Sequence, residues 1–176
     1  MYKKIIEGYK NFVEIHYATK DIAHNFSHIE RIICTVDKII SYCAYENLDY
    51  SLLAFLQCFH GLNRKLESDD DFKQETVNFL ISQGWTSENI ANAFQSLKCH
   101  CKSPKNTEED IVYDANFIEV VGAFGLARAF NSAGMRGQSV EEIASILKTH
   151  YYDVIQCRFP MGKPYMKKEK NFLKNS

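Results

Sequence analysis

Three short segments place side chains that bind metals or transfer protons at the ends of apolar stretches. The first carries two histidines, His24 and His28, directly before an apolar stripe. The second is His60, which ends the most apolar stretch of the chain, and the third contains Asp114 and Asn116. Ligands held on rigid, packed helices can converge on one divalent cation. We therefore expect these segments to line a metal pocket.

The sequence around these segments has a helical period almost throughout, interrupted by only three prolines and eight glycines. After Ser27, apolar residues recur at helical spacing, and we predict Ser27 as an N-cap that forms a capping box with Glu30. Signals for β-strands are weak. We therefore predict an all-α fold with helices at 27–43, 50–59, 71–83, 87–97, 111–130 and 140–156, joined by polar loops at 63–70 and 102–109.

Three details of these helices lead to further expectations. The segment 50–59 is apolar on nearly all sides, which is typical of a central, buried helix. Thr86 or Ser87 is expected to cap the helix that follows. Gly122 and Gly125 lie on the predicted 111–130 helix, where small residues would let another helix approach closely.

The composition is that of an ordinary globular domain. The chain has 176 residues, of which 45% are hydrophobic and 24% charged. A formal net charge of −1 gives no basis for a nucleic-acid partner. No apolar run approaches the roughly 20 residues that cross a bilayer, and the N-terminal segment does not read as a signal peptide. We expect one cytoplasmic domain over 1–176, with a solvated, lysine-rich tail.

The three segments resemble the motifs of HD-superfamily phosphohydrolases. AHNFSHIERI is similar to their opening motif, and LLAFLQCFHGL to the helix that ends in the His-Asp pair for which the superfamily is named. DIVYDANFIEVVGAFGLARAF resembles a later segment of a branch of small bacterial HD hydrolases, some of which act on nucleotides. The resemblance runs from about residue 9 to residue 130. It implies an HD-domain helical bundle, with 140–176 as a C-terminal helix and tail.

The resemblance also implies a divalent-metal site, and this chain departs from it. His28 and His60 match the two histidine ligands. Gly61 stands where the family has an aspartate ligand, and Asn116 stands where it has another, although a shifted alignment would make Asp114 that ligand. Mg²⁺ prefers carboxylate oxygens and would be held poorly. We therefore expect either a transition metal (Mn, Fe, Co, Ni or Zn) or no metal.

Further residues are assigned roles by their place in these motifs or near them. Asp114, Glu119 and His100 are the candidate catalytic residues, because each could reach a shifted metal. The candidate substrate-binding residues are His24, Arg64 and Lys65. Arg31 and Arg128 match arginines of the family pattern and would be either ion-pair partners or phosphate ligands, as the sequence favours neither role.

The six cysteines are expected to be reduced thiols that pack as small hydrophobic residues. Cys99 and Cys101 flank His100 and would make half of a zinc site. A second cysteine pair at ligand spacing is missing from the sequence, so we do not predict a zinc site.

Two functional hypotheses stay open. The first is a hydrolase that acts on a small phosphate ester or nucleotide through an altered metal set. The second is a pseudoenzyme that keeps the pocket but binds a ligand or a protein partner. An HD scaffold adapted to a different reaction is a third possibility, and no motif selects it. The sequence indicates neither a particular substrate nor an oligomeric state.

Overall fold

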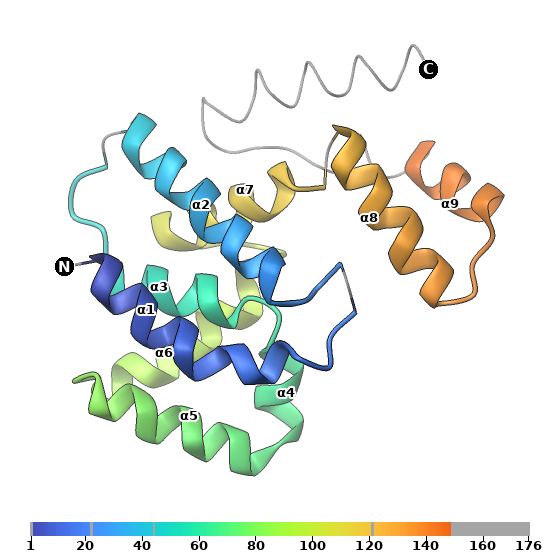
Figure 1. Ribbon diagram of the computed structural model, residues 1–176. Helices are drawn as coiled ribbons and strands as arrows, with labels where there is room; N and C mark the ends of the chain where they lie inside the picture. The colour runs from blue at the N-terminus through green and yellow to red at the C-terminus, as the bar shows by residue number, and fades with distance from the viewer. Residues whose placement is uncertain (1, 22, 44, 121, 149–176) are drawn as a thin grey trace. The chain divides into compact units, whose positions relative to one another are not determined.

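The computed structural model describes residues 2–21, 23–43, 45–120 and 122–148. No strand occurs among these residues, which confirms the predicted all-α class (Figure 1). No helix in this part of the chain combines the length and hydropathy needed to cross a bilayer. The helices are α1 (Tyr2–Val13), α2 (Phe26–Cys43), α3 (Tyr50–Phe59), α4 (Asn63–Ser68), α5 (Asp70–Ser82), α6 (Ser87–Cys99), α7 (Thr107–Ile118), α8 (Gly122–Met135) and α9 (Val140–Ile146), with a short 3₁₀ helix, η1 (Glu14–Tyr17), after α1.

The chain divides into two compact units, and each is built from two segments of sequence. Unit 1 comprises Met1–Ala18 and Glu46–Val112, and unit 2 comprises Thr19–Tyr45 and Tyr113–Ser176. Helix α7 begins in unit 1 and ends in unit 2. The expectation of one domain over 1–176 stays a prediction.

Helix α3 is the centre of unit 1, as its apolar sequence predicted. All of its residues from Leu53 to Phe59 are buried, and it packs against α1 and α6. Asp49 begins the helix by accepting hydrogen bonds from two backbone N–H groups of its first turn. Stacked rings of Phe12 and Phe59 join α1 to α3, and those of Phe55 and Phe94 join α3 to α6. This packing fixes the end of α3, where His60 lies.

Residues 63–70 were predicted to be a polar loop, and that prediction is wrong. Most of the segment forms α4, and the remainder contains the start of α5. Leu66 is the residue that α4 buries. One buried apolar residue in a six-residue helix leaves no repeating apolar pattern from which the helix could be predicted. Asp69 caps α5 by accepting from the N–H of Phe72. Thr86 caps α6 in the same way, as predicted.

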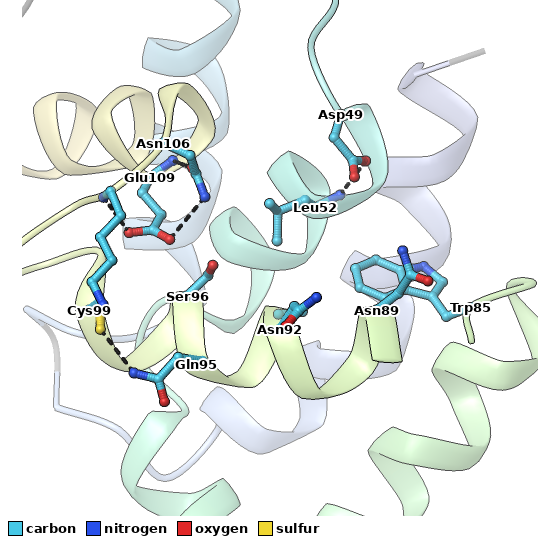
Figure 2. Close-up of a pocket in the computed structure, with 12 residues that line it drawn as sticks. Asp49, Leu52, Trp85, Asn89, Asn92, Gln95, Ser96, Cys99, Asn106 and Glu109 are labelled. Carbon is cyan, nitrogen blue, oxygen red and sulfur yellow. Dashed lines mark hydrogen bonds between the residues drawn. The ribbon is translucent and has the colours of Figure 1, made fainter. Parts of the chain in front are cut away.

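Unit 1 also has a surface cavity of about 420 Å³ beside α6 (Figure 2). Its wall is rich in amide side chains, with Trp85 at one end and Glu109 at the other. Glu109 is buried, and its carboxylate accepts hydrogen bonds from the side chain of Asn106 and the backbone of Lys105. None of the predicted metal, catalytic or substrate-binding residues lines this cavity.

In unit 2, the apolar stripe of α2 is buried as predicted, but its cap differs. The helix begins at Phe26, so Ser27 lies inside its first turn rather than at the N-cap. The Ser27 hydroxyl donates to the side chain of Asn25 and accepts from Arg31. At the other end of the unit, α9 begins with a capping box of Ser139 and Glu142. The predicted 140–156 helix extends beyond the described residues.

The predicted helix over 111–130 is also wrong, because α7 ends at Ile118 and α8 begins at Gly122. A Cβ on Gly125 would lie 2.2 Å from the carbonyl carbon and oxygen of Val120. The close approach that the glycine permits is therefore to the turn before α8, and not to a second helix. This turn places Glu119 at the end of α7.

Candidate functional site

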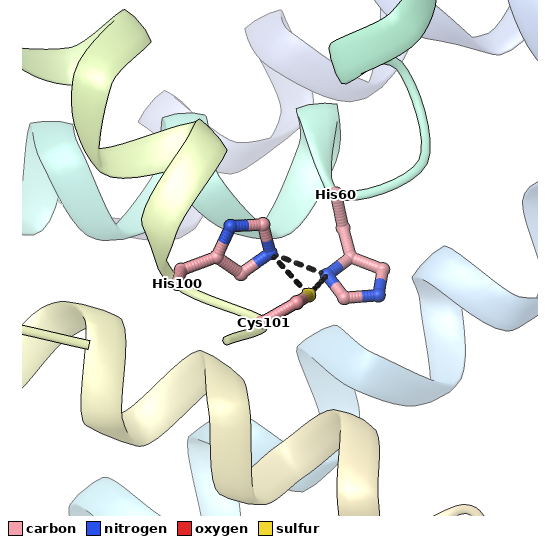
Figure 3. Close-up of side chains that lie close together, drawn as sticks. All are labelled: His60, His100 and Cys101. Atoms are coloured by element: carbon pink, nitrogen blue, oxygen red, sulfur yellow. Dashed lines mark hydrogen bonds between the residues drawn. The ribbon is translucent and has the colours of Figure 1, made fainter. Parts of the chain in front are cut away.

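In unit 1, three potential metal ligands meet where α3 and α6 end (Figure 3). His60 Nδ1 lies 2.8 Å from His100 Nε2, and Cys101 Sγ lies 3.1 Å from the same His100 nitrogen. The third side of the triangle, from Cys101 Sγ to His60 Nδ1, is 3.7 Å. Two imidazole nitrogens and one sulfur therefore point at a common space. We refer to these three residues as the His/Cys cluster.

The backbone orients His100 within this cluster. His100 follows α6 directly, is 2% exposed, and its Nδ1 is 2.8 Å from the carbonyl oxygen of Leu97. A carbonyl accepts only, so Nδ1 carries the proton and the lone pair lies on Nε2, the atom that faces His60 and Cys101. Burial lowers the pKa of His100, which keeps the ring neutral. Without a metal, His60 Nδ1 and the thiol are thus the donors to His100.

Burial also raises the pKa of the Cys101 thiol to about 12. The cysteine is therefore a neutral thiol in the metal-free cluster. A bound metal would change this, because cysteine coordinates as the thiolate and releases its proton on binding.

Next to His60, the side chain of Tyr17 packs against Gly61, the position at which the family resemblance implies an aspartate ligand. The Tyr17 hydroxyl donates to the carbonyl oxygen of Cys58 at 2.8 Å and accepts from the N–H of Gly61 at 3.2 Å. A Cβ on Gly61 would lie 3.2 Å from Cε1 of the Tyr17 ring, closer than most real contacts of this kind. Tyr17 is 1% exposed, so its ring is packed on nearly all sides. An aspartate at this position would need the tyrosine to shift.

In unit 2, His28 belongs to a second cluster, built around Glu119. The carboxylate lies 2.9 Å from His28 Nδ1 and accepts from Arg31 Nε at 3.0 Å and from Arg128 Nη1 at 3.1 Å. Arg128 also donates to the backbone carbonyl of Ala23 at 2.7 Å. Both His28 and Glu119 are buried. We refer to His28, Arg31, Glu119 and Arg128 as the Glu119 cluster.

This arrangement sets the tautomer of His28. Burial lowers the pKa of His28, and the nearby guanidinium groups of Arg128 and Arg31 lower it further, although the Glu119 contact opposes them. A neutral His28 must donate from Nδ1 to the carboxylate, which places its lone pair on Nε2. Metal-binding histidines in proteins usually donate their other ring N–H to a carboxylate, a backbone carbonyl or water. Glu119 therefore acts on His28 through a hydrogen bond.

The two candidates for the later ligand, Asp114 and Asn116, lie two residues apart on α7. Asp114 is completely buried and Asn116 is partly buried. Residues two apart on a helix point in nearly opposite directions. At most one of these two side chains can therefore face a given metal site. The structure does not select between them, and both stay predicted ligands.

The candidate substrate-binding residues lie in two places. In unit 2, His24 is exposed, and its Nδ1 is 2.8 Å from each carboxylate oxygen of Asp21. In unit 1, Arg64 and Lys65 begin α4. The Lys65 ammonium pairs with Asp69 and lies 4.9 Å from the ring centroid of Phe72, whereas Arg64 is exposed. Their proposed contacts with substrate stay predictions.

The sequence did not predict a role for Cys101 or for Tyr17, which lies beside His60. Cys101 was set aside because no second cysteine pair accompanies it, and Tyr17 carried no motif at all. His60 lies at the end of α3, beside the end of α6. This tertiary contact brings a second histidine next to Cys101. A search for any ligand type, rather than for cysteines alone, would have kept this site open.

No family model matches the chain, and no curated protein matches it in sequence. Solved structures do match it along nearly its whole length. The Lin1889 protein from Listeria innocua is 21% identical, with a TM-score of 0.72, and the match covers 99% of this chain and 92% of that one.

Two further structures carry descriptions that bear on function. Bacillus subtilis YpgQ in complex with ADP is 19% identical, with a TM-score of 0.76 and the same coverage. An HD-superfamily hydrolase from Bacillus thuringiensis is 16% identical, with a TM-score of 0.64, and the match covers 99% of this chain and 93% of that one. Likeness at such identities establishes a fold and not an activity. The chain has an HD-domain-like helical fold, as its three motifs predicted.

Proposed function

We propose that this protein is a phosphohydrolase homologue of the HD type, with weak or altered metal-dependent activity on a small phosphate ester or nucleotide. The HD-domain-like fold supports this proposal, since a structural neighbour with this fold was crystallised with ADP. The observation in this chain that carries the proposal is the Glu119 cluster. It joins a buried, oriented histidine at a family ligand position to two arginines, the side chains best suited to phosphate oxygens.

The residues present do not fit the cation that a histidine–aspartate site usually holds. Gly61 offers no side-chain donor, and the ring of Tyr17 packs against the place where a Cβ would be. Asn116 would supply a neutral amide oxygen in place of a carboxylate. A hard cation such as Mg²⁺ would lose the negative charges that hold it.

The test is phosphate release from metal-stripped protein, supplied in turn with Mg²⁺, Mn²⁺, Co²⁺, Ni²⁺ and Zn²⁺. The substrates are nucleoside mono-, di- and triphosphates and a chromogenic phosphomonoester. We expect release with at least one transition metal and little with Mg²⁺. His28→Gln should lower the rate at least about tenfold, the lower bound for losing a metal-site partner. His16→Gln is the matched control, since His16 packs on Phe72 in unit 1. No release with any metal and substrate would refute hydrolysis.

A ligand-binding pseudoenzyme is the second candidate, and the contact between Tyr17 and Gly61 favours it. It predicts that the native protein binds ADP, measured by calorimetry, and releases no phosphate. It also predicts that restoring carboxylates with Gly61→Asp and Asn116→Asp brings back affinity for Mn²⁺. Because Tyr17 crowds position 61, the restored variant should also carry Tyr17→Leu. Turnover by the native protein would exclude this candidate.

A further inference from the structure

We infer that His60, His100 and Cys101 form a site for a thiophilic divalent cation, with Zn²⁺ as its reference metal. The site takes one histidine from the end of α3 and a histidine and a cysteine from the end of α6. Only His60 is shared with the ligand set that the family resemblance implies. The inference concerns metal binding and does not depend on the proposed hydrolysis.

The geometry is close to that of a zinc centre. In a tetrahedral site with ordinary zinc–ligand bond lengths, two nitrogens lie about 3.3 Å apart and a nitrogen and a sulfur about 3.6 Å apart. The corresponding separations here are 2.8 Å between the nitrogens and 3.1 and 3.7 Å from the sulfur to each nitrogen. To admit the ion, the nitrogen–nitrogen separation and the shorter nitrogen–sulfur separation must each open by about 0.5 Å. The three ligand atoms form a triangle that opens into the face of such a tetrahedron (Figure 3).

The chemistry of the donors selects the metal. Imidazole nitrogen and thiolate sulfur favour zinc and other borderline or soft metals over Mg²⁺ and Ca²⁺. The hydrogen bond from His100 Nδ1 to the Leu97 carbonyl directs the Nε2 lone pair into the site, as outer partners of zinc-bound histidines do. Three protein ligands leave the fourth position of a tetrahedral ion to a water molecule or a ligand oxygen, the arrangement of open rather than structural zinc sites.

The chain offers a matched pair of cysteines for the test. Cys99 lies two residues before Cys101, but its sulfur accepts a hydrogen bond from Gln95 at 3.3 Å and lines the surface cavity (Figure 2). Cys99→Ser therefore removes a neighbouring thiol without touching the His/Cys cluster. Cys101→Ser replaces the sulfur with an oxygen of similar reach and leaves both histidines in place.

The experiment titrates the metal-stripped, full-length chain with Co²⁺ and then displaces it with Zn²⁺ in the presence of a competing chelator. We expect one equivalent of Co²⁺ to produce thiolate-to-metal charge-transfer absorption in the near ultraviolet. Cys101→Ser should abolish this absorption and weaken Zn²⁺ binding at least about 100-fold, the upper end of what losing even an outer-shell partner costs. Cys99→Ser should retain both properties.

A second measurement covers the case in which the Cys101→Ser protein fails to fold. In the native chain, one equivalent of Zn²⁺ should slow alkylation of Cys101 but not of Cys99, as followed by peptide mass spectrometry. Metal that binds without thiolate absorption, or equally well to Cys101→Ser, overturns the inference and leaves the proposed hydrolase standing. Stoichiometric binding with the thiolate signal but without any phosphate release supports the inference and counts against the proposed hydrolysis.

Discussion

Replacing Glu119 with glutamine tests whether one buried carboxylate holds the Glu119 cluster together. The native carboxylate accepts from three donors: Arg31 on one oxygen, and His28 and Arg128 on the other. Glutamine has one oxygen and one NH₂ group. In either amide orientation the NH₂ group faces at least one of these donors, so at least one charge-assisted hydrogen bond is lost.

The size of the effect follows from these contacts. A hydrogen bond to a charged group contributes about 1.5–3 kcal/mol, and removing one partner of a buried ion pair costs about 3–5 kcal/mol. The side chain of Arg31 is 36% exposed and can turn toward water, whereas that of Arg128 is 12% exposed and cannot turn as easily. The expected loss for Glu119→Gln is therefore at the lower end, about 3 kcal/mol of unfolding free energy.

Equilibrium urea unfolding, followed by far-ultraviolet circular dichroism, measures this loss. Glu14→Gln is the matched control, because Glu14 is exposed on η1 and its loss of charge should change the stability by less than about 0.5 kcal/mol. If Glu119→Gln unfolds within about 0.5 kcal/mol of the native chain, the carboxylate does not organise the cluster and the reasoning is refuted.

Two further predictions concern a pair of glycines and the effect of pH. Gly125→Ala should destabilise the chain by about 1–3 kcal/mol or more through its clash with the preceding turn. Gly134→Ala, in open space on the same helix, should stabilise it by about 0.4–1 kcal/mol, and urea unfolding of both variants checks the opposite signs. Burial lowers the folded-state pKa of His28 and His100 below the ordinary histidine value of 6.5, so the unfolded state binds more protons below that pH. The unfolding free energy of metal-free protein should therefore fall as the pH drops through 6.5, and a constant value across this range would contradict the assignment.

The sequence predicts the helices whose residues carry a strong local signal. The segment of α3 is apolar on nearly every side, and its predicted bounds agree with the structure. Helix α4 was missed because one buried leucine, Leu66, leaves no period to detect in six residues. The break between α7 and α8 was missed for a different reason. At this break the backbone of Val120 occupies the space that a Cβ on Gly125 would need, which is a feature of the folded backbone rather than of the apolar pattern.

The candidate site shows the same division between local and tertiary information. The sequence identified His28, His60 and His100 one at a time, from motif positions and neighbours. It also noticed Cys101 beside His100, but sought the missing half of a zinc site in another cysteine pair. The partner is instead His60, which meets the other two only because α3 packs against α6. The spacing of residues along the chain therefore does not predict that His60 lies near His100 and Cys101.

The burial of polar groups argues for a retained role in each of the two clusters, the His/Cys cluster of unit 1 and the Glu119 cluster of unit 2. A buried polar side chain costs free energy unless it is hydrogen-bonded, and an apolar side chain of similar size avoids that cost. His28, His100 and Glu119 are nevertheless buried, and each makes hydrogen bonds with oriented partners. Gly61 offers no ligand to a hard cation, while the site inferred at His60, His100 and Cys101 would suit a soft one. Which metal the native chain retains after purification is therefore the measurement that separates a converted site from an abandoned one.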